Sequence, residues 1–573
     1  MKSSFCILLI GILILSVSTF SRTRADEIKD LQTEIPRVMK EAHVPGLQIA
    51  VIRDGKIAWH QSFGVKNATT KEPVTDKTIF EAASVTKPLF AYYIMMLMDQ
   101  GVIDLDKPLV GYLSKEFLES ALGHPLDQPD FHREWLEKIT IRHALSHSGG
   151  LPHGEGGIPY PLHFEPGTKW KYSATGYEVL QKIVEDLKGD KLDKLMQKEV
   201  LDPIGMTRSC LVWREDYEEN MANGHGFFGR PEEFRKRTEA ISSASLYTTA
   251  EDYAKFVCAV MNGTGLKPET WKEMLTSQID MNKEKGLGWS LGFGTQDDAN
   301  GRAIWQWGDY GIFRNYIIAY PKEKTGVVYL TDSHNGLSIC SYVVAHSIGA
   351  QAMGCRELNY RPFDGLCHQL AWALKEGGPK AMERLPELKA KYPGELSSMD
   401  ADYLNYVLQE EGLTAEATAV LEYNLSKHPE SGTARLALAR AYIDAGNFDL
   451  ARTRLEDARK AVEDTVSAGV VDWNMDYIRA MSGAFKVAEV DLKKYAGDYG
   501  ARHFQIKNGT LHYLRDGGRY ADYRELVPLS RDTFFIKGMS SFRMTFELDE
   551  NGNPVKVVGT YEQGGRDESP RNK

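Results

Sequence analysis

The 573-residue sequence has few of the features that mark a disulfide-bonded scaffold, a metalloprotein or a nucleic-acid-binding protein. Its six cysteines are scattered, so they imply no disulfide framework, and only Cys355 and Cys367 lie close together in the chain. No cluster of cysteine and histidine has zinc-ligand spacing, and we expect neither a metal nor another cofactor. There is no basic run, and the net charge of −10 argues against binding to nucleic acid or to anionic membranes.

Long apolar runs are also scarce, and the one at the N-terminus covers only 16 residues, from Phe5 to Phe20. That is short for a membrane-spanning helix, which needs about 20 residues. Small residues follow, and Thr23-Arg24-Ala25 fits a cleavage site, so residues 1–25 are predicted to be a secretory signal peptide. Cleavage would remove three basic residues and leave a net charge of −13. The sequence therefore predicts an exported protein, periplasmic or extracellular, with an uncleaved N-terminal membrane anchor as the alternative.

The remainder has the composition of a globular protein and is too long for one hydrophobic core. Residues 26–360 carry strand-like segments near both ends and mostly helical segments between them. This order predicts an α+β domain, in which an antiparallel sheet is flanked by helices and a helical lobe is inserted.

Proline becomes sparse and helical periodicity dominates in residues 361–487. A repeat of 34 residues relates Gly412 to Gly446 and Ala417 to Ala451, and the segment resembles a tetratricopeptide helix pair. So few repeats do not form a stable solenoid alone, so we expect this segment to pack on a neighbour. A structural spacer is favoured over a groove that binds a protein partner.

Short alternating segments separated by turn sequences fill residues 488–573. Asn508-Gly509 and Asn551-Gly552 are typical of hairpin turns. We predict a small all-β, barrel-like domain here, with a disordered tail from Gly564 to Lys573.

The strongest chemical signal is Ser84-Val85-Thr86-Lys87, which runs directly into an apolar stretch. A serine and a lysine three residues apart at a helix start lie about one turn apart on the same face. A partly desolvated lysine can accept the serine proton, and the positive helix end favours the developing alkoxide. The pattern is common by chance, however, and serine is also a frequent N-cap.

Four further segments occur in the order and spacing of one family. They are Thr140-Ile141-Arg142-His143-Ala144-Leu145-Ser146-His147-Ser148-Gly149-Gly150-Leu151-Pro152, Tyr172-Ser173-Ala174-Thr175-Gly176-Tyr177, Leu201-Asp202-Pro203-Ile204-Gly205-Met206 and Ser245-Leu246-Tyr247-Thr248-Thr249-Ala250-Glu251-Asp252. Over residues 27–355 the chain resembles the serine beta-lactamase-like hydrolases, a group that includes class C beta-lactamases, DD-peptidases and esterases.

The resemblance implies that Ser84 is the nucleophile that accepts the acyl group and that Lys87 accepts its proton. Tyr172 corresponds to the family's catalytic tyrosine. A phenol near an ammonium can have a lowered pKa and can shuttle protons to the leaving group. His143 and His147 lie within the segment from Thr140 to Pro152. They are expected to stabilise the fold and not to take part in catalysis.

Two positions depart from the family pattern. Ala174 replaces an asparagine that helps to hold the lysine and the substrate amide, so amide recognition is in doubt. The family also has a Lys-Thr-Gly or His-x-Gly triplet on the strand beside the nucleophile. Lys324-Thr325-Gly326 matches it in letters but is predicted to be a later hairpin turn, and the aligned triplet is Trp307-Gly308-Asp309.

In this alignment Trp307 replaces the basic residue that helps to bind the carboxylate of penicillins and D-alanyl peptides. Gly308 still allows close approach of a backbone. The backbone N–H groups of Ser84 and Tyr310 are predicted to form the oxyanion hole. Arg314 could supply a replacement charge, which Asp309 would oppose.

The sequence therefore predicts an exported serine hydrolase that cleaves a small-molecule or peptide ester or amide through an acyl-serine intermediate. An esterase or peptidase is favoured over a true beta-lactamase. One alternative is a DD-peptidase or penicillin-binding protein. The other is a scaffold protein with a decayed site, which the residues at positions 174 and 307 would support.

Overall fold

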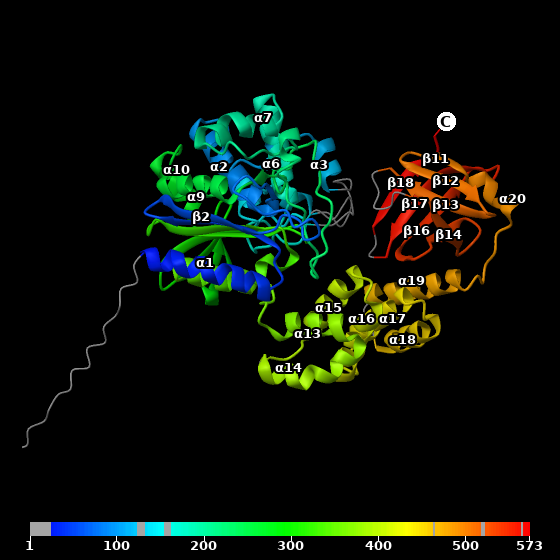
Figure 1. Ribbon diagram of the computed structural model, residues 1–573. Helices are drawn as coiled ribbons and strands as arrows, with labels where there is room; N and C mark the ends of the chain where they lie inside the picture. Colours follow the sequence, from blue (N-terminus) through cyan, green and yellow to red (C-terminus); the bar gives the residue numbers. More distant parts are fainter. Residues whose placement is uncertain are drawn as a thin grey trace, which may run out of the picture.

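The computed structural model describes residues 24–122, 132–153, 162–392, 394–461, 465–516, 522–562 and 565–572. Residues 1–23 of the predicted signal peptide lie outside these ranges, and Arg24 begins helix α1 (Arg24–Glu41). Within the described ranges, no helix has the length and apolar character needed to cross a membrane. Figure 1 shows three parts in chain order: a mixed α and β part, a helical part and a β-barrel.

An eight-stranded antiparallel sheet forms the centre of the first part, in the order β2-β1-β10-β9-β8-β7-β6-β5. The early strand β1 pairs with the late strand β10, so both ends of this part meet in one sheet around the predicted helical insert. The strands are β1 (Gly46–Arg53), β2 (Lys56–Gly64), β5 (Ile279–Asn282), β6 (Leu287–Trp289), β7 (Gly294–Asp298), β8 (Gly301–Asp309), β9 (Arg314–Tyr320) and β10 (Thr325–Thr331). A separate pair is formed by β3 (Phe80–Glu81) and β4 (Tyr247–Thr248).

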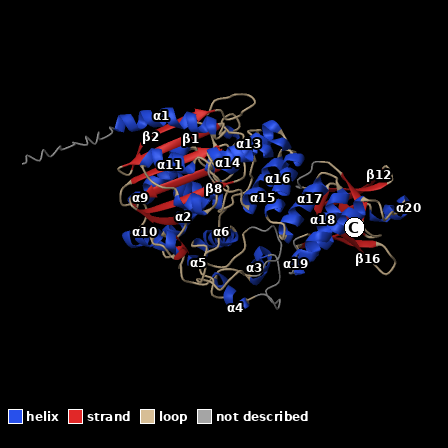
Figure 2. Ribbon diagram, turned by 90° about the horizontal axis from the view of Figure 1, so that it is seen from below, coloured by secondary structure: helices blue, strands red, loops and turns tan. Residues whose placement is uncertain are grey.

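Helices cover both faces of this sheet, so its central strands are apolar on both sides. One face carries α1, α11 (Cys340–Ile348) and α12 (Met353–Glu357), and the other carries α2 (Thr86–Asp99) and α9 (Ala250–Asn262) (Figures 1 and 2). The lobe beyond α2 contains α3 (Lys115–Leu122), α4 (Arg133–Leu136), α5 (Ile141–Leu145), α6 (Thr175–Lys188), α7 (Leu192–Met196), α8 (Asp202–Ile204) and α10 (Pro268–Leu275). Helix α2 is apolar on nearly every side, as expected for a helix inside a core.

The helical part packs on the first part, as the sequence predicted for so short a repeat. Phe227 of the first part lies in one apolar cluster with residues of α13 and α15, and the ring of His43 stacks on Trp372 at 3.4 Å. The helices are α13 (Leu366–Gly377), α14 (Leu385–Lys391), α15 (Ser398–Glu410), α16 (Thr414–Lys427), α17 (Gly432–Asp444), α18 (Phe448–Ala461) and α19 (Thr465–Met481), followed by α20 (Glu489–Leu492).

The last eight strands form a nearly closed antiparallel barrel in sequential order. They are β11 (Gly497–Tyr499), β12 (Arg502–Lys507), β13 (Thr510–Arg515), β14 (Arg524–Pro528), β15 (Thr533–Ile536), β16 (Met539–Leu548), β17 (Pro554–Tyr561) and β18 (Arg566–Pro570). A bridge between Tyr499 and Arg571 brings the two ends together.

The prediction of a disordered tail is wrong, because residues 566–570 pair with β17 as the last strand of the barrel. Charged side chains of this strand are partners of residues on other strands. Asp567 accepts hydrogen bonds from the buried guanidinium of Arg502 at 2.6 Å, and Glu568 accepts one from Lys556 at 2.7 Å.

Candidate active site

Ser84 lies in a single 3₁₀ turn, Ala83–Val85, directly before α2. Ala83 has a φ of +50°, in the left-handed region that residues with a side chain rarely adopt. Such backbone strain persists only where the surroundings fix it and is typical of active sites. The turn leaves Ser84 partly exposed while the residues on both sides of it are buried.

Lys87 points back at Ser84 from the first turn of α2. Its Nζ lies 3.2 Å from Ser84 Oγ and 2.8 Å from the carbonyl oxygen of Ser243. The side chain is only 1% exposed, and this burial lowers its pKa to about 7, although the negative charge of Glu178 acts in the other direction. Near neutral pH a large fraction of Lys87 is therefore an uncharged amine that can accept the proton of Ser84.

Tyr172 lies on the other side of the lysine. Its ring centroid is 4.7 Å from Lys87 Nζ, and its hydroxyl accepts a hydrogen bond from Gln306 Nε2 at 3.1 Å. The predicted lowering of its pKa is wrong. Burial raises the pKa of Tyr172, and the hydrogen bonds to Ser84 and Gln306 offset this only in part. Tyr172 is thus a protonated phenol that can donate a proton.

Gln306 of β8, rather than Trp307, turns its side chain toward the nucleophile. Its Nε2 donates at 3.1 Å to the carbonyl oxygen of Ser84 as well as to Tyr172. Successive side chains on a strand point to opposite faces, so a slip of one residue exchanges the two. The predicted triplet is therefore wrong by one position, and the residues beside Ser84 are Gln306-Trp307-Gly308. The side chain of Gln306, like that of Trp307, carries no charge.

At Gly308, strand β8 contacts the backbone that directly precedes Ser84. A Cβ at this position would lie 2.3 Å from the carbonyl oxygen of Ala82. The predicted close approach of a backbone is therefore present, but the approaching backbone is the protein's own. Only glycine lets β8 pack this closely on the strained turn.

The prediction that Tyr310 donates to the oxyanion is wrong, because its N–H donates to the carbonyl oxygen of Phe313 at 3.0 Å in the β8–β9 turn. Backbone N–H groups along an antiparallel strand point alternately to its two edges. The N–H of Asp309 therefore faces the other edge of β8, where pairing with β7 has already ended at Trp305. Gln306, whose side chain reaches the carbonyl oxygen of Ser84, lies on this same unpaired stretch of β8.

Arg314 and Asp309 neutralise each other instead of facing a substrate. Arg314 Nε donates to Asp309 Oδ1 at 3.0 Å, and its Nη1 donates to the carbonyl oxygen of His334 at 2.7 Å. The second carboxylate oxygen of Asp309 accepts a hydrogen bond from Tyr360 at 2.7 Å. The predicted replacement charge from Arg314 is therefore wrong.

Ala174 forms the N-cap of α6, and its backbone N–H donates to His153 Nδ1 at 3.1 Å. The methyl group of Ala174 cannot form a hydrogen bond to a substrate amide. One turn later lies Glu178, which was not predicted as a site residue. It accepts a hydrogen bond from Ser243 Oγ at 3.1 Å, and its negative charge acts on Lys87. Its position in the first turn of the helix after Tyr172 was the available signal.

The two histidines of the segment from Thr140 to Pro152 stabilise the fold, as predicted. His143 and Thr140 cap α5 through two reciprocal hydrogen bonds of 3.3 Å. His147 Nδ1 accepts the N–H of Ser173 at 3.2 Å, and its ring lies 4.3 Å from that of Tyr172.

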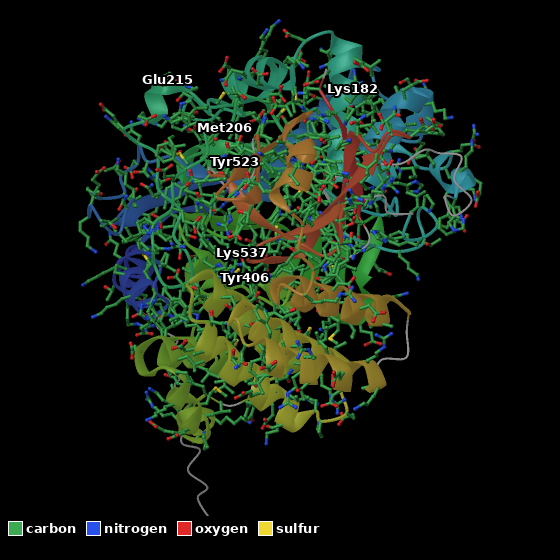
Figure 3. All side chains as sticks on the ribbon, turned by 90° about the vertical axis from the view of Figure 1, so that its right-hand side faces the viewer. Lys182, Met206, Glu215, Tyr406, Tyr523 and Lys537 are labelled. Atoms are coloured by element: carbon green, nitrogen blue, oxygen red, sulfur yellow. The ribbon has the colours of Figure 1, made fainter. Side chains whose placement is uncertain are left out.

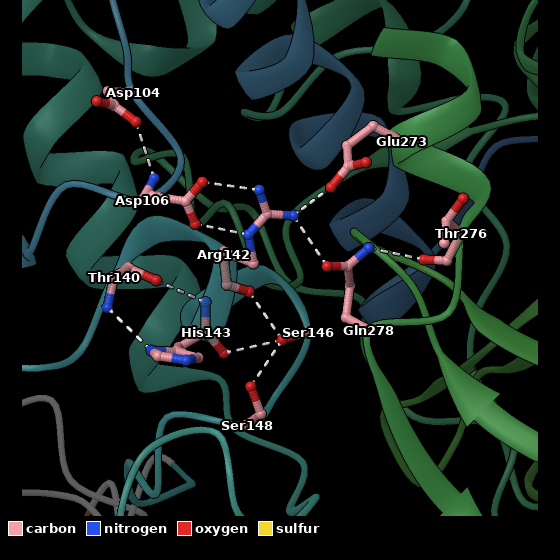
Figure 4. A network of polar contacts seen from close by, with 10 residues as sticks. All are labelled: Asp104, Asp106, Thr140, Arg142, His143, Ser146, Ser148, Glu273, Thr276 and Gln278. Carbon is pink, nitrogen blue, oxygen red and sulfur yellow. Dashed lines mark hydrogen bonds and ion pairs between the residues drawn. The ribbon is translucent and has the colours of Figure 1, made fainter. Parts of the chain in front are cut away.

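Arg142, directly before His143, connects the segment to the rest of the domain through its side chain (Figure 4). It donates to both carboxylate oxygens of Asp106, to Gln278 at 2.9 Å and to Glu273. Lys324, the start of the rejected triplet, lies in the β9–β10 turn as predicted, and its Nζ donates to the carbonyl oxygen of Met261.

Two family profiles match the sequence of this chain, one in the first part and one in the helical part. The Beta-lactamase family profile matches residues 31–338, and a tetratricopeptide repeat profile matches residues 408–468. Esterase EstB of Burkholderia gladioli is 25% identical over 335 residues, which cover 49% of this chain and 82% of the esterase. Penicillin-binding protein 4* of Bacillus subtilis (strain 168) is 23% identical over 342 residues, 53% of this chain and 71% of that protein. The crystal structure of a D-alanine carboxypeptidase AmpC from Burkholderia cenocepacia has a TM-score of 0.49 and 20% identity, covering 57% of this chain and 99% of that one.

Proposed function

The chain belongs to the beta-lactamase family of serine hydrolases, and from this premise we propose that it hydrolyses esters or neutral amides through an acyl intermediate on Ser84. The observation that carries the proposal is the buried Lys87, whose Nζ lies 3.2 Å from Ser84 Oγ and whose pKa is lowered to about 7. A lysine in this state can act as the base for a serine nucleophile.

In the first step Ser84 Oγ attacks the acyl carbonyl carbon and passes its proton to Lys87 Nζ. The negative charge that develops on the carbonyl oxygen is stabilised by the N–H groups of Ser84 and Asp309. When the tetrahedral intermediate collapses, the bond to the leaving group breaks, and that group takes a proton from the Tyr172 hydroxyl. The proton held by Lys87 then restores the tyrosine.

Water completes the reaction by attacking the acyl-serine carbonyl carbon. It gives up one proton to the same amine, and the bond between the acyl carbon and Ser84 Oγ breaks. Ser84 recovers its proton, and the product is a carboxylic acid. Each proton that leaves one group is accepted by another group named here, so the cycle ends with the starting protonation states.

Substrate preference follows from Gln306, a neutral group where the family places lysine or histidine. Without that cation, a carboxylate beside the scissile bond gains no ionic partner from β8. We therefore propose that ester hydrolysis exceeds beta-lactam hydrolysis. A D-alanyl peptidase is the second candidate, because Ser84, Lys87 and Tyr172 would serve it equally.

The test compares p-nitrophenyl acetate, nitrocefin and a D-Ala-D-Ala peptide as substrates of protein beginning at residue 26. We expect the ester to have the highest kcat/KM, and Ser84→Ala to lower it by a factor of about 10³ or more, as loss of a catalytic nucleophile does. Nitrocefin turnover as fast as ester turnover would contradict the ester preference. A peptide preferred over the ester would favour the peptidase.

We also propose that residues 1–25 direct export and are then removed. The support is the short apolar run with small residues behind it. N-terminal sequencing of protein recovered from outside the cytoplasm should begin at Asp26, and retention of Met1 would contradict cleavage.

A further inference from the structure

The end of strand β8 is fastened to the backbone of the nucleophile turn. A Cβ on Gly308 would lie 2.3 Å from the carbonyl oxygen of Ala82, two residues before Ser84. Asn315, which faces Gly308 across β9, is fully buried and donates a hydrogen bond to the same carbonyl oxygen at 3.2 Å. The N–H of Asp309, the proposed oxyanion donor, therefore follows directly after a residue that is packed on the nucleophile turn.

The carboxylate of Asp309 holds this strand end from the opposite direction. Its Oδ1 accepts hydrogen bonds from the N–H of Gly311 at 2.7 Å and from Arg314 Nε at 3.0 Å. Its Oδ2 accepts one from the hydroxyl of Tyr360 at 2.7 Å. A side chain that is hydrogen-bonded at both oxygens is locked in one orientation, and it restricts the peptide group to which it is attached.

Tyr360 lies between α12 and α13, in the segment that leads from the first part into the helical part. Its hydroxyl donates to Asp309, and the centre of its ring lies 5.4 Å from the guanidinium carbon of Arg314, within the range of a cation–π contact. One tyrosine therefore contacts both members of the ion pair. The junction between the two parts of the protein thus reaches the strand end that carries the oxyanion donor.

Helix α15 supports Arg314 from the side of the helical part. Arg314 Nη1 donates at 2.7 Å to the carbonyl oxygen of His334, whose Nε2 lies 3.0 Å from the hydroxyl of Tyr403 on α15. Burial raises the pKa of Tyr403 to about 12, and the charge of Arg314 acts in the other direction, as expected of groups that lie close together. Tyr406, three residues further along α15 and labelled in Figure 3, lines a cavity together with Gly311. This face of α15 therefore lies against the β8–β9 turn.

We propose that Tyr360 and Arg314 are positioning residues for the oxyanion hole and that they act through the carboxylate of Asp309. The proposal rests on the proposed hydrolase function and adds residues that do not touch the substrate. It also gives the helical part a role in the reaction, because α15 and the segment at Tyr360 keep the N–H of Asp309 in place. An oxyanion donor that is held in advance needs no reorganisation when the charge develops.

The test removes the hydroxyl of Tyr360 and makes the same change at a matched tyrosine. In Tyr360→Phe the ring remains beside Arg314, and one oxygen of Asp309 loses its donor. Tyr320, at the other end of β9, donates to Asp298 at 2.7 Å, so Tyr320→Phe removes a hydrogen bond of the same kind and length. We expect Tyr360→Phe to lower kcat for p-nitrophenyl acetate about tenfold, less than the roughly 10²–10³-fold for complete loss of an oxyanion donor. The control should keep its kcat within about twofold of wild type.

The Michaelis constant separates a positioning role from a general loss of structure. Acylation and deacylation both pass through a tetrahedral oxyanion, so a misplaced donor slows both steps alike and should leave KM within about twofold of wild type. Arg314→Lys keeps the charge but not the two directed hydrogen bonds, and it should lower kcat at least as much as Tyr360→Phe. A fall in kcat no larger in Tyr360→Phe than in Tyr320→Phe would overturn the proposal, and so would a raised KM with an unchanged kcat. A wild-type kcat in Arg314→Lys would overturn the role of Arg314.

Failure of the hydrolase function is a separate outcome, seen as no ester hydrolysis by the wild type. Hydrogen exchange of the backbone amides, followed by mass spectrometry of peptides that cover residues 306–314, then decides the positioning role. Exchange there should be at least about fivefold faster in Tyr360→Phe than in wild type and unchanged in Tyr320→Phe, because the lost hydrogen bond frees the end of β8. Equal exchange in the two variants would overturn the proposal.

Discussion

The most informative single residue is Lys87, because its protonation state sets the pH at which the site can work. Its pKa is lowered to about 7 by burial, so the amine becomes competent as the pH rises through that value. Tyr172 stays protonated beyond its ordinary range, because burial raises its pKa. The kcat/KM for an ester should therefore rise between pH 5 and about 8 with a midpoint near 7, and then remain level up to about pH 10. A midpoint near 10 would contradict a desolvated lysine base.

Gln306→Lys tests the neutral residue of β8. A second cation next to Lys87 disfavours its charged form, so the midpoint of the pH profile should move to lower pH. The added charge should also raise nitrocefin turnover relative to ester turnover. The uncharged control Gln306→Met should lower the rate without the shift, because it removes the hydrogen bonds to Ser84 and Tyr172 but adds no charge. An unchanged midpoint in Gln306→Lys would show that the two side chains do not interact.

Ser84, Lys87 and Tyr172 could be predicted from the sequence because each sits in a contiguous segment whose spacing is chemically constrained. Gln306 could not, because it lies in a buried strand where a slip of one residue gives an equally acceptable apolar pattern. The sequence also could not predict whether the pKa of Tyr172 is raised or lowered. It depends on how deeply the phenol is buried, and that is decided by packing.

At the scale of elements, the contact of β8 with the nucleophile turn depends on Gly308. Gly308→Ala places a methyl group 2.3 Å from the carbonyl oxygen of Ala82, so β8 or the turn must move. We expect a loss of about 1–3 kcal/mol in the free energy of unfolding, typical of overpacking, together with a marked fall in kcat. Urea denaturation and ester kinetics measure the two effects.

Gly469→Ala is the matched control, because its new methyl group on α19 would meet no atom within 4 Å. It should stabilise the protein by up to about 1 kcal/mol, the helix-propensity difference, and leave kcat unchanged. If Gly308→Ala behaved like this control, the proposed close packing of β8 would be refuted.

The strand at residues 566–570 shows that amino-acid composition alone does not predict whether a charged segment is ordered. The tail was predicted to be disordered, but each of two carboxylates in it has a basic partner on another strand. Charged residues are typical of edge strands, where they discourage pairing with other molecules. A pattern confined to one strand does not reveal those partners.

For the whole molecule, the docking of the helical part on the first part is concentrated at Phe227, which is 4% exposed. Phe227→Ala should destabilise the protein by about 3–5 kcal/mol, as for other buried phenylalanines, and should separate the unfolding of the two parts in calorimetry. Phe485→Ala, at a phenylalanine that is 39% exposed, should change stability by less than about 0.5 kcal/mol. A single unshifted transition in Phe227→Ala would show that Phe227 does not hold the two parts together.

The arrangement of the three parts could not be derived from the sequence, although their fold classes could. Helical and strand periodicities are local, whereas the interface joins His43 and Phe227 to Trp372, residues far apart in the chain. Nothing in their local patterns distinguishes them from ordinary core aromatics.

The most direct test of an activated Ser84 is intact-mass spectrometry after treatment with a fluorophosphonate probe, using protein that begins at residue 26. The structure predicts one adduct on the wild type, none on Ser84→Ala and a strongly reduced rate of labelling for a Lys87 variant, because the neutral amine activates the hydroxyl. The absence of an adduct on folded wild-type protein, or an adduct that persists in Ser84→Ala, would contradict the account.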